Sequence, residues 1–377
     1  MSKNSDMAVF IFRRDLRLED NTGLLAACEK HNQVIPLFCF DPRQADKDNN
    51  EYFSKNAFRF MCDSLLEVNR HLKKRGSRLH VITKKPDKAL QMLLDDKDIS
   101  AVYCNADYTP FSRKRDKQMK AICENRDVTF RRLHDICLTK PGSVLTNQGD
   151  PYRVYTPFAD KARTQPVDTP RRNNFRNVTS VRADYIHDAG TIKDYRPAGG
   201  DQIAQQGGRA NATKKLRRIE QHANYDEDRE VPAIEGTTRL SAHLKFGTIS
   251  PREFYWTVRD ALGVDHGLIT ELYWRDFYQH VIYHNPEVLG ESFNDQFDNL
   301  PWRHDKDDFA RWKEGKTGFP IVDAGMRELN KIGWMHNRVR MIVASFQTKD
   351  LHIDWRWGEK YFAQKLVDYD PASNNGG

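Results

Sequence analysis

The sequence predicts a chain of two parts, an α/β part with a parallel sheet covered on both faces and a second part that is all helical. In the first 135 residues, short apolar runs alternate with helical patterns, whereas from residue 213 onward helical patterns dominate. The six cysteines all precede residue 138 and the seven tryptophans all follow residue 255. The two parts therefore have different cores, and a length of 377 residues favours two domains over one.

Five strands and four helices are expected in the α/β part. The candidate strands are residues 8–12, 34–40, 79–82, 101–104 and 128–133, and the candidate helices are 21–30, 56–74, 87–94 and 113–125. The strands are mostly continuous apolar runs separated by helices, which is typical of a buried parallel sheet. We therefore expect a doubly wound, five-stranded parallel sheet, with helix starts at Asp20-Asn21 and Pro86-Asp87.

We place the boundaries of the two domains and the connection between them at residues 1–135, 136–212 and 213–377. The middle segment holds six prolines and little periodicity, which indicates a long connection. A charged loop, residues 13–21, follows the first strand. Open α/β sheets bind ligands at the carboxyl ends of their strands, so this loop is either a ligand-binding segment or a solvated charged surface.

Composition excludes several classes of protein. Sixty Lys and Arg against 53 Asp and Glu give a net charge of +7, which permits a polyanionic partner without requiring one. The cysteines form no CxxC pair and no metal-spaced cluster with histidine, so we expect reduced thiols, an intracellular location and no metal. The apolar run 7–12 is too short for a signal peptide or a membrane span. Neither a dinucleotide fingerprint nor a P-loop is present.

Two motifs of the helical part could bind a ligand. Residues 236–241 place hydroxyls and backbone N–H groups at a helix start, which suits a phosphate, although simple helix capping explains them equally well. Glu271 and Trp274 are spaced i, i+3, so a carboxylate and an aromatic plane point the same way. That pair suits a flat ligand with a hydrogen-bonding edge, such as a nucleobase, or else the tryptophan belongs to the core.

Two polar segments lie near the end of the chain. We expect residues 333–341 to be a helix on which Asn337 and Met341 share one face, with Arg340 beside them. A core helix rarely carries so much polarity unless something polar lies against it. Residues 368–377 add two acids and two amides in a loop.

Together these segments resemble the photolyase/cryptochrome family, and most closely the class I cyclobutane pyrimidine dimer photolyases. The resemblance extends from residue 9 to residue 377, and it is carried by the motifs 9–17, 237–241, 271–278, 314–324, 333–341 and 368–377. Asn337 stands where the (6-4) photolyases have a histidine, and Asn374 stands where plant-type cryptochromes have an aspartate.

The resemblance implies FAD as the cofactor and assigns residues to it. Tyr225, Thr237, Thr238, Arg239, Leu240 and Ser241 match residues that hold the FAD phosphates and ribitol. Arg340 and Asp368 match an ion pair beside the isoalloxazine, Asp370 matches a further flavin contact, and Asn374 matches the residue that faces flavin N5. In such a site the protein tunes the cofactor through hydrogen bonds around its ring.

The resemblance also implies light-driven repair, in which excited reduced FAD passes an electron to a flipped-out dimer in damaged DNA. Glu271, Trp274, Asn337 and Met341 match the dimer pocket, and Arg229, Arg275 and Arg338 are expected on the DNA. Trp302 and Trp355 match an electron-transfer chain. The alternatives are a cryptochrome-like photoreceptor without repair activity and an inactive fragment.

Two departures from the family change what is expected. Where folate-binding members have an Asn-Glu pair, this chain has Phe111-Ser112, so a deazaflavin is favoured over folate as a second chromophore. Family members continue for most of another hundred residues past the match to 374–377, so we expect a C-terminally truncated chain. We also expect the protein to be a monomer that acts in the nucleoid, or in a nucleus.

Overall fold

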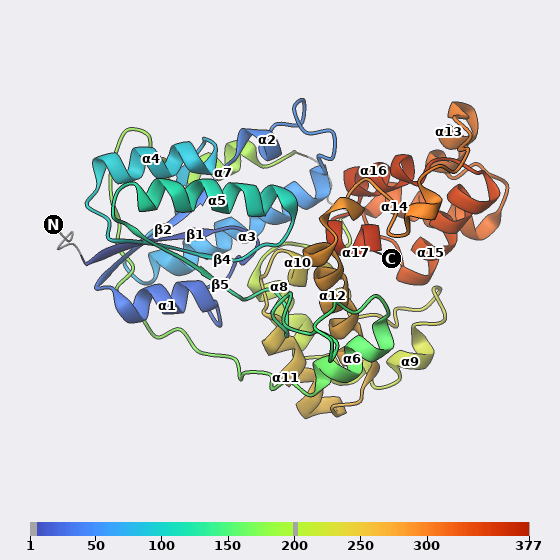
Figure 1. The fold of residues 1–377 in the computed structure, drawn as a ribbon, viewed down its shortest axis with the longest axis horizontal. Helices are drawn as coiled ribbons and strands as arrows, with labels where there is room; N and C mark the ends of the chain where they lie inside the picture. The colour runs from blue at the N-terminus through green and yellow to red at the C-terminus, as the bar shows by residue number, and fades with distance from the viewer. Residues whose placement is uncertain (1–5, 199–202, 377) are drawn as a thin grey trace.

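In a computed structural model, the chain forms an α/β part followed by a helical part (Figure 1). The structure describes residues 6–198 and 203–376. Residues 199–202 of the predicted connection, and the two ends of the chain at 1–5 and 377, lie outside the described residues.

The sheet of the α/β part has five parallel strands in the order β3-β2-β1-β4-β5. These strands are β1 (Met7–Phe12), β2 (Gln33–Cys39), β3 (His80–Ile82), β4 (Ala101–Asn105) and β5 (Thr129–Leu133). Their ends differ from the predicted ones by at most one residue. The doubly wound fold class predicted from the sequence is confirmed.

Helices cover both faces of this sheet (Figure 1). They are α1 (Thr22–Lys30), α2 (Pro42–Ala45), α3 (Lys55–Lys73), α4 (Pro86–Asp96) and α5 (Pro110–Glu124). Alternate side chains of β1 point to opposite faces, so Phe10 packs with the core under α1 and α3 while Val9 packs with the core under α4 and α5. As expected, Asn21 caps α1, and its side chain accepts a hydrogen bond from the Leu24 backbone at 3.1 Å.

The segment between the two parts is more ordered than its prolines suggest. It contains α6 (Tyr155–Arg163), α7 (Gly190–Tyr195) and the first half of α8 (Arg209–Leu216). Pro157 lies in the first turn of α6, where a missing N–H costs little. Further along, Val178 pairs with Val34 and His187 with Val81, so this stretch runs beside the sheet. The expectation of a long connection with little periodic structure is therefore wrong for α6 and for the stretch that runs along the sheet.

Most of the buried apolar side chains described in the helical part lie in two cores, one among α6, α8, α11 and α12 and one among α13 to α16, and a smaller cluster joins Ile282, Val288 and Ala372. Its helices are α9 (Tyr225–Asp228), α10 (Ser241–Lys245), α11 (Pro251–Leu262), α12 (Gly267–His284), α13 (Lys306–Glu314), α14 (Pro320–Ile332), α15 (Asn337–Ser345), α16 (Trp355–Lys365) and α17 (Pro371–Gly376). The final helix, α17, packs against α12 (Figure 1). Across the described ranges, no helix is long and apolar enough to span a membrane.

The helix predicted over residues 333–341 is wrong in its first four residues. Gly333 has φ of 68° and ends α14 in the left-handed conformation that glycine adopts easily. The next helix, α15, begins at Asn337, after His336 accepts a hydrogen bond from the Arg338 backbone at 3.2 Å. Asn337, Arg340 and Met341 do lie on one helix, as expected.

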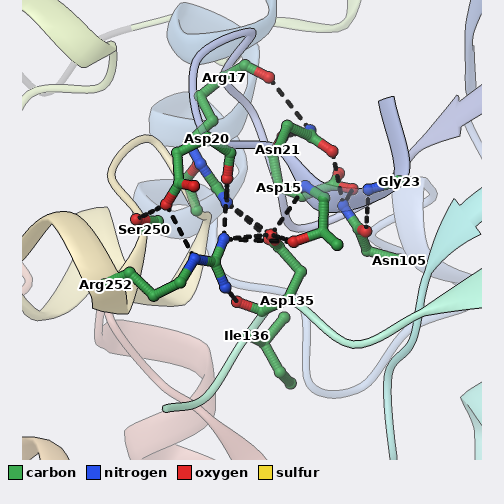
Figure 2. A network of polar contacts seen from close by, with 12 residues as sticks. Asp15, Arg17, Asp20, Asn21, Gly23, Asn105, Asp135, Ile136, Ser250 and Arg252 are labelled. Carbon is green, nitrogen blue, oxygen red and sulfur yellow. Dashed lines mark hydrogen bonds and ion pairs between the residues drawn. The ribbon is translucent and has the colours of Figure 1, made fainter. Parts of the chain in front are cut away.

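A buried group of charges joins the two parts of the chain (Figure 2). We call it the junction cluster; it consists of Arg17, Asp20, Asp135, Ser250 and Arg252. Arg17, from the loop after β1, donates to both carboxylate oxygens of Asp135 at 2.8 and 2.7 Å. Arg252, from α11, donates to Asp135 at 2.9 Å and to Asp20 at 3.0 Å. Ser250 also donates to Asp20.

The loop after β1 is therefore not the solvated surface that was one expectation for it. Asp15, Arg17, Asp20 and Asn21 are all buried. The backbone N–H of Leu16 donates to the Phe246 carbonyl of the helical part at 3.0 Å. At this crossing Gly247 has φ of 62°, and a Cβ atom there would lie 2.5 Å from the Arg14 carbonyl oxygen. Only glycine allows the two backbones to approach so closely.

Asp135 pairs with two guanidinium groups at once, and Asp20 supplies a second anion to Arg252. Burial alone would raise the pKa of Asp135, but the attraction of Arg17 and Arg252 holds the pKa well below its ordinary value. The carboxylate consequently stays charged. Buried charges are tolerated when they are paired and fully hydrogen-bonded, and removing one partner leaves the other uncompensated.

We expect Asp135→Asn to lower the free energy of unfolding by about 3–5 kcal/mol, because Arg17 and Arg252 lose their shared anion. Urea denaturation followed by circular dichroism measures this. The matched control is Asp95→Asn, which breaks an exposed ion pair with Arg126 and should cost at most about 1 kcal/mol. Equal, small losses in both variants would show that the junction cluster does not hold the two parts together.

Candidate functional site

Most of the residues that the sequence singled out lie on or close to α9, α10, α12, α15 and α17. They form two groups. One surrounds the buried carboxylate of Asp368, and the other surrounds the carboxylate of Glu271 on α12.

Asp368 receives two hydrogen bonds on one oxygen. Ser241 Oγ donates to Asp368 Oδ2 at 2.5 Å and Arg340 Nη2 donates to the same atom at 2.9 Å. The other oxygen, Oδ1, is buried and has no hydrogen-bond partner among the described residues. A buried acceptor without a partner is costly, so Oδ1 is a natural place for a donor from a ligand.

The loop before α10 carries backbone strain. Arg239 has φ of 49°, a left-handed conformation that is uncommon for residues other than glycine. Its guanidinium lies 4.6 Å from the ring centroid of Trp334, and its carbonyl accepts from Lys215 Nζ at 2.9 Å. No side chain caps the five-residue helix α10, so the capping explanation of this motif is wrong. Within the loop, Leu240 is buried in a core while Thr237 and Thr238 are half-buried.

Asp370 is fastened to both parts of the chain. Arg14 of the α/β part forms an ion pair with it, and Gln279 of α12 donates to Asp370 Oδ1 at 3.1 Å. The backbone N–H of Asp370 donates to Asn374 Oδ1 at 3.0 Å. The Gln279 Oε1 atom is buried and, among the described residues, unpartnered.

On the other side, Glu271 pairs with Arg229, whose Nη1 lies 2.6 Å from Glu271 Oε1. Burial raises the pKa of Glu271, and the positive charges of Arg229 and Arg338 oppose that rise. The end of α9, the first turns of α12 and the start of α15 therefore converge here. Tyr225, the first residue of α9, is buried, and the Arg229 guanidinium lies over its ring at 5.4 Å from the centroid.

Trp274 is stacked rather than free. Tyr155 of α6 lies parallel to it, with ring centroids 3.6 Å apart and planes at 6°. The Tyr155 hydroxyl donates to the Thr270 carbonyl at 3.1 Å, which fixes the ring beside α12. Tyr155 is not among the predicted site residues, because it lies in the predicted connection and no local pattern indicates its contact with α12.

The remaining predicted residues differ in placement. Asn337 is exposed and the Met341 side chain is 56% exposed, so both are accessible on α15. Trp302 and Trp355 each lie within two residues of the backbone pair between Arg303 and Ile353.

The structure does not support the predicted DNA contact of Arg275. Its guanidinium turns inward and donates to the Ile136 carbonyl and, at 3.5 Å, to the Leu244 carbonyl. These two carbonyls belong to different segments, so Arg275 links parts of the fold to one another.

A cavity of about 270 Å³ lies at the carboxyl ends of β1 and β2, where open α/β sheets bind ligands. Both parts of the chain line it, among others with Arg14, Phe40, Arg115, Lys245 and Tyr369. Arg115 Nη2 is buried and lacks a hydrogen-bond partner in the described part of the chain. No cluster of His, Cys, Asp or Glu in residues 6–198 and 203–376 could hold a metal ion.

The pKa of Asp370 gives a test of its contacts. Burial would raise this pKa, but Arg14 and Arg275 lower it from 3.8 to about 2. A carboxylate whose pKa is lower in the folded state than in the unfolded state stabilises the fold at pH values above its unfolded-state pKa. This stabilisation is lost as the pH falls through the folded-state pKa.

Protonation of Asp370 should cost the unmodified protein about 1 kcal/mol of its free energy of unfolding between about pH 6 and about pH 3. We expect Asp370→Asn to lack this part of the loss. Urea denaturation of both proteins at the two pH values measures the difference. An unchanged pH dependence in Asp370→Asn would contradict the ion pair with Arg14.

Comparison with known proteins identifies the family. The model of the DNA photolyase family matches residues 8–174, and that of the FAD binding domain of DNA photolyase matches residues 268–377. The deoxyribodipyrimidine photo-lyase of Alkalihalophilus pseudofirmus is 36% identical over 100% of this chain and 80% of that protein. The one from Escherichia coli is 33% identical over 97% of this chain and 79% of that protein.

Solved structures agree. The photolyase from Sulfolobus tokodaii, whose crystal structure contains two FAD molecules, has a TM-score of 0.87 at 40% identity, covering 98% of this chain and 81% of its own. A class III photolyase from Agrobacterium tumefaciens has a TM-score of 0.89 at 33% identity, covering 99% and 78%. A cryptochrome from Synechocystis has a TM-score of 0.86 at 26% identity, covering 98% and 80%. The chain therefore belongs to the photolyase/cryptochrome family and carries the FAD-binding domain of the DNA photolyases.

Proposed function

We propose that the chain is a deoxyribodipyrimidine photo-lyase, which uses light to split cyclobutane pyrimidine dimers in DNA. Relatives with that name match nearly the whole chain at 33% to 36% identity, which favours repair over the cryptochrome alternative. The observation that carries the proposal is the placement of Glu271 and Trp274 on α12, with Arg229 beside them and Asp368 on the other side of the site.

The residues around Asp368 fit a flavin. Asp368 Oδ1 and Gln279 Oε1 are buried acceptors without partners among the described residues, and a flavin ring and its ribityl chain carry N–H and O–H donors. When bound, reduced FAD supplies the light-excited electron that opens the dimer. Arg340 and Ser241 hold the Asp368 carboxylate in place, and Asn374 offers a neutral amide whose Oδ1 is already bound to the Asp370 backbone. Tyr225 and residues 237–241 would hold the phosphates and ribitol.

The residues around Glu271 would receive the dimer. Trp274 provides an aromatic wall, and Tyr155 fixes its orientation by stacking on it. Glu271 can hydrogen-bond the edge of a pyrimidine, and Asn337 and Met341 are accessible on α15. Extruding a base costs least where its stacking is already damaged, which favours the dimer over an intact base.

Arg229 and Arg338 are proposed to contact the DNA backbone. Both carry a positive charge at the edge of the Glu271 site, and phosphate contacts of this kind make binding dependent on salt. Trp302 and Trp355 are proposed to conduct electrons toward the flavin, and the backbone pair Arg303–Ile353 keeps them in one region.

For the cavity at the carboxyl end of the sheet, we propose a second chromophore of the deazaflavin type rather than a folate. The Arg43 guanidinium lies over the Phe111 ring, 4.7 Å from the ring centroid, and the backbone N–H of Ser112 donates to the Thr109 side chain at 3.3 Å. Phe111 and Ser112 therefore do not supply the Asn and Glu side chains that folate-binding members have at these positions. An absorption spectrum of the purified protein would report both chromophores.

Repair itself is tested with protein reconstituted with reduced FAD, dimer-containing oligonucleotide and blue light. We expect loss of dimers under light and none in the dark. Unchanged dimers in the presence of bound, reduced flavin would contradict the proposed function.

Replacing Trp274 separates binding from cofactor retention. We expect Trp274→Ala to weaken binding of dimer-containing DNA by about 1–3 kcal/mol, the usual contribution of a stacked base, while FAD content stays unchanged. Fluorescence anisotropy and the flavin absorbance measure the two quantities. Trp274→Phe keeps a stacking surface and should lose less. Equal losses of FAD and of DNA binding would mean that Trp274 is a core residue instead.

A further inference from the structure

Glu230, the second residue after α9, contacts both arginines proposed for the DNA backbone. Arg338 Nη2 forms an ion pair with Glu230 Oε1, and Arg229 Nε lies 3.6 Å from the same oxygen. The Glu230 side chain is 52% exposed, so it covers the two guanidinium groups from the solvent side. Nothing in the sequence pattern singled out this residue.

Carboxylates surround the two arginines in the DNA-free protein. Glu230, Glu271 and the more distant Asp226, at 4.0 Å, all pair with Arg229, and Glu230 also pairs with Arg338. Glu271 lies deeper and bonds Arg229 at 2.6 Å, whereas Glu230 lies outside and reaches both arginines. Of the two carboxylates, Glu230 is therefore the one that an incoming polyanion can displace without disturbing the ion pair beside Trp274.

A phosphate can accept a hydrogen bond from a donor of Arg338 that Glu230 leaves without a partner. The Arg338 Nε atom is buried and has no hydrogen-bond partner among the described residues. Guanidinium groups bind phosphate with two parallel N–H donors, and an unused buried donor costs free energy. A phosphate group also presents several oxygens, which suits two neighbouring arginines better than one carboxylate oxygen does.

We infer that Glu230 occupies the place of a DNA phosphate between Arg229 and Arg338, so that binding of any DNA must first displace it. The inference rests on the proposed function, which assigns these two arginines to the DNA backbone. Because phosphates carry no sequence or damage information, the displacement weakens binding of damaged and undamaged DNA alike. Its benefit is a shorter stay on undamaged DNA, which greatly outnumbers lesions.

The test compares Glu230→Gln with Glu227→Gln. Glu227 is exposed on α9, three residues before Glu230, so both variants change the net charge equally and only one touches the arginines. We expect Glu230→Gln to bind both undamaged and dimer-containing duplexes about two- to fivefold more tightly than Glu227→Gln at about 0.1 M salt. Because salt screens the ion pairs of the free protein, the difference should shrink as salt rises. Fluorescence anisotropy over a salt series measures both effects.

Two further variants distinguish failure of this inference from failure of the proposed function. Arg338→Gln should weaken DNA binding, and adding Glu230→Gln to it should improve binding less than Glu230→Gln does alone, because only Arg229 is then left for Glu230 to pair with. If Arg338→Gln binds weakly but Glu230→Gln matches or falls below Glu227→Gln, the inference is wrong and the DNA contact stands. If Arg338→Gln and Arg229→Gln both bind DNA like the unmodified protein, the proposed backbone contacts fail, and the inference fails with them.

Discussion

The arrangement of the two parts depends on one buried anion, Asp135. It follows the last strand of the sheet and takes a guanidinium from each side, Arg17 of the loop after β1 and Arg252 of α11 (Figure 2). Neither arginine could be buried alone at acceptable cost. Because the same carboxylate satisfies both, moving the helical part away from the sheet would leave at least one charge uncompensated.

This constraint reaches the candidate site through the neighbouring residues of the same loop. Arg14, three residues before Arg17, pairs with Asp370, and Asp370 in turn bonds Gln279 of α12. The segment that carries Asp368 and Asn374, predicted as one loop, is a loop only up to Asp370 and continues as α17 (Pro371–Gly376). Its position is thus set partly by the α/β part. The proposed cofactor site is therefore not a property of the helical part alone, and its geometry depends on a sheet that supplies none of the predicted flavin ligands.

The sequence predicts the sheet well because its signal is local. Apolar runs of four to seven residues between helical patterns are typical of buried strands, and the ends of each strand lie within one residue of the predicted ones. The same local reasoning identifies Glu271 and Trp274 as sharing a helix face. It does not say what covers that face, and so Tyr155 on Trp274 was missed.

Long-range pairing also explains the other differences. On composition alone, the charged residues 13–21 are expected to be exposed to solvent. Their burial is favourable only because of partners more than a hundred residues away, namely Asp135, Arg252 and Phe246. Arg275 looks like a DNA contact until the carbonyls of Ile136 and Leu244 are placed beside it. Local periodicity cannot supply either result, because it does not determine which segments meet.

The polar groups on the two sides of the site differ in their hydrogen-bond and ion-pair partners, and this difference fits the two kinds of ligand proposed. On the side of Asp368, a buried oxygen is without a partner among the described residues, so the protein alone is destabilised there and a ligand that donates to it is held firmly. On the side of Glu271, Arg229 and Arg338 already have carboxylate partners, although Arg338 Nε has none among the described residues. A DNA phosphate there exchanges one anion for another. The first arrangement suits a resident cofactor, and the second suits a substrate that must bind and leave.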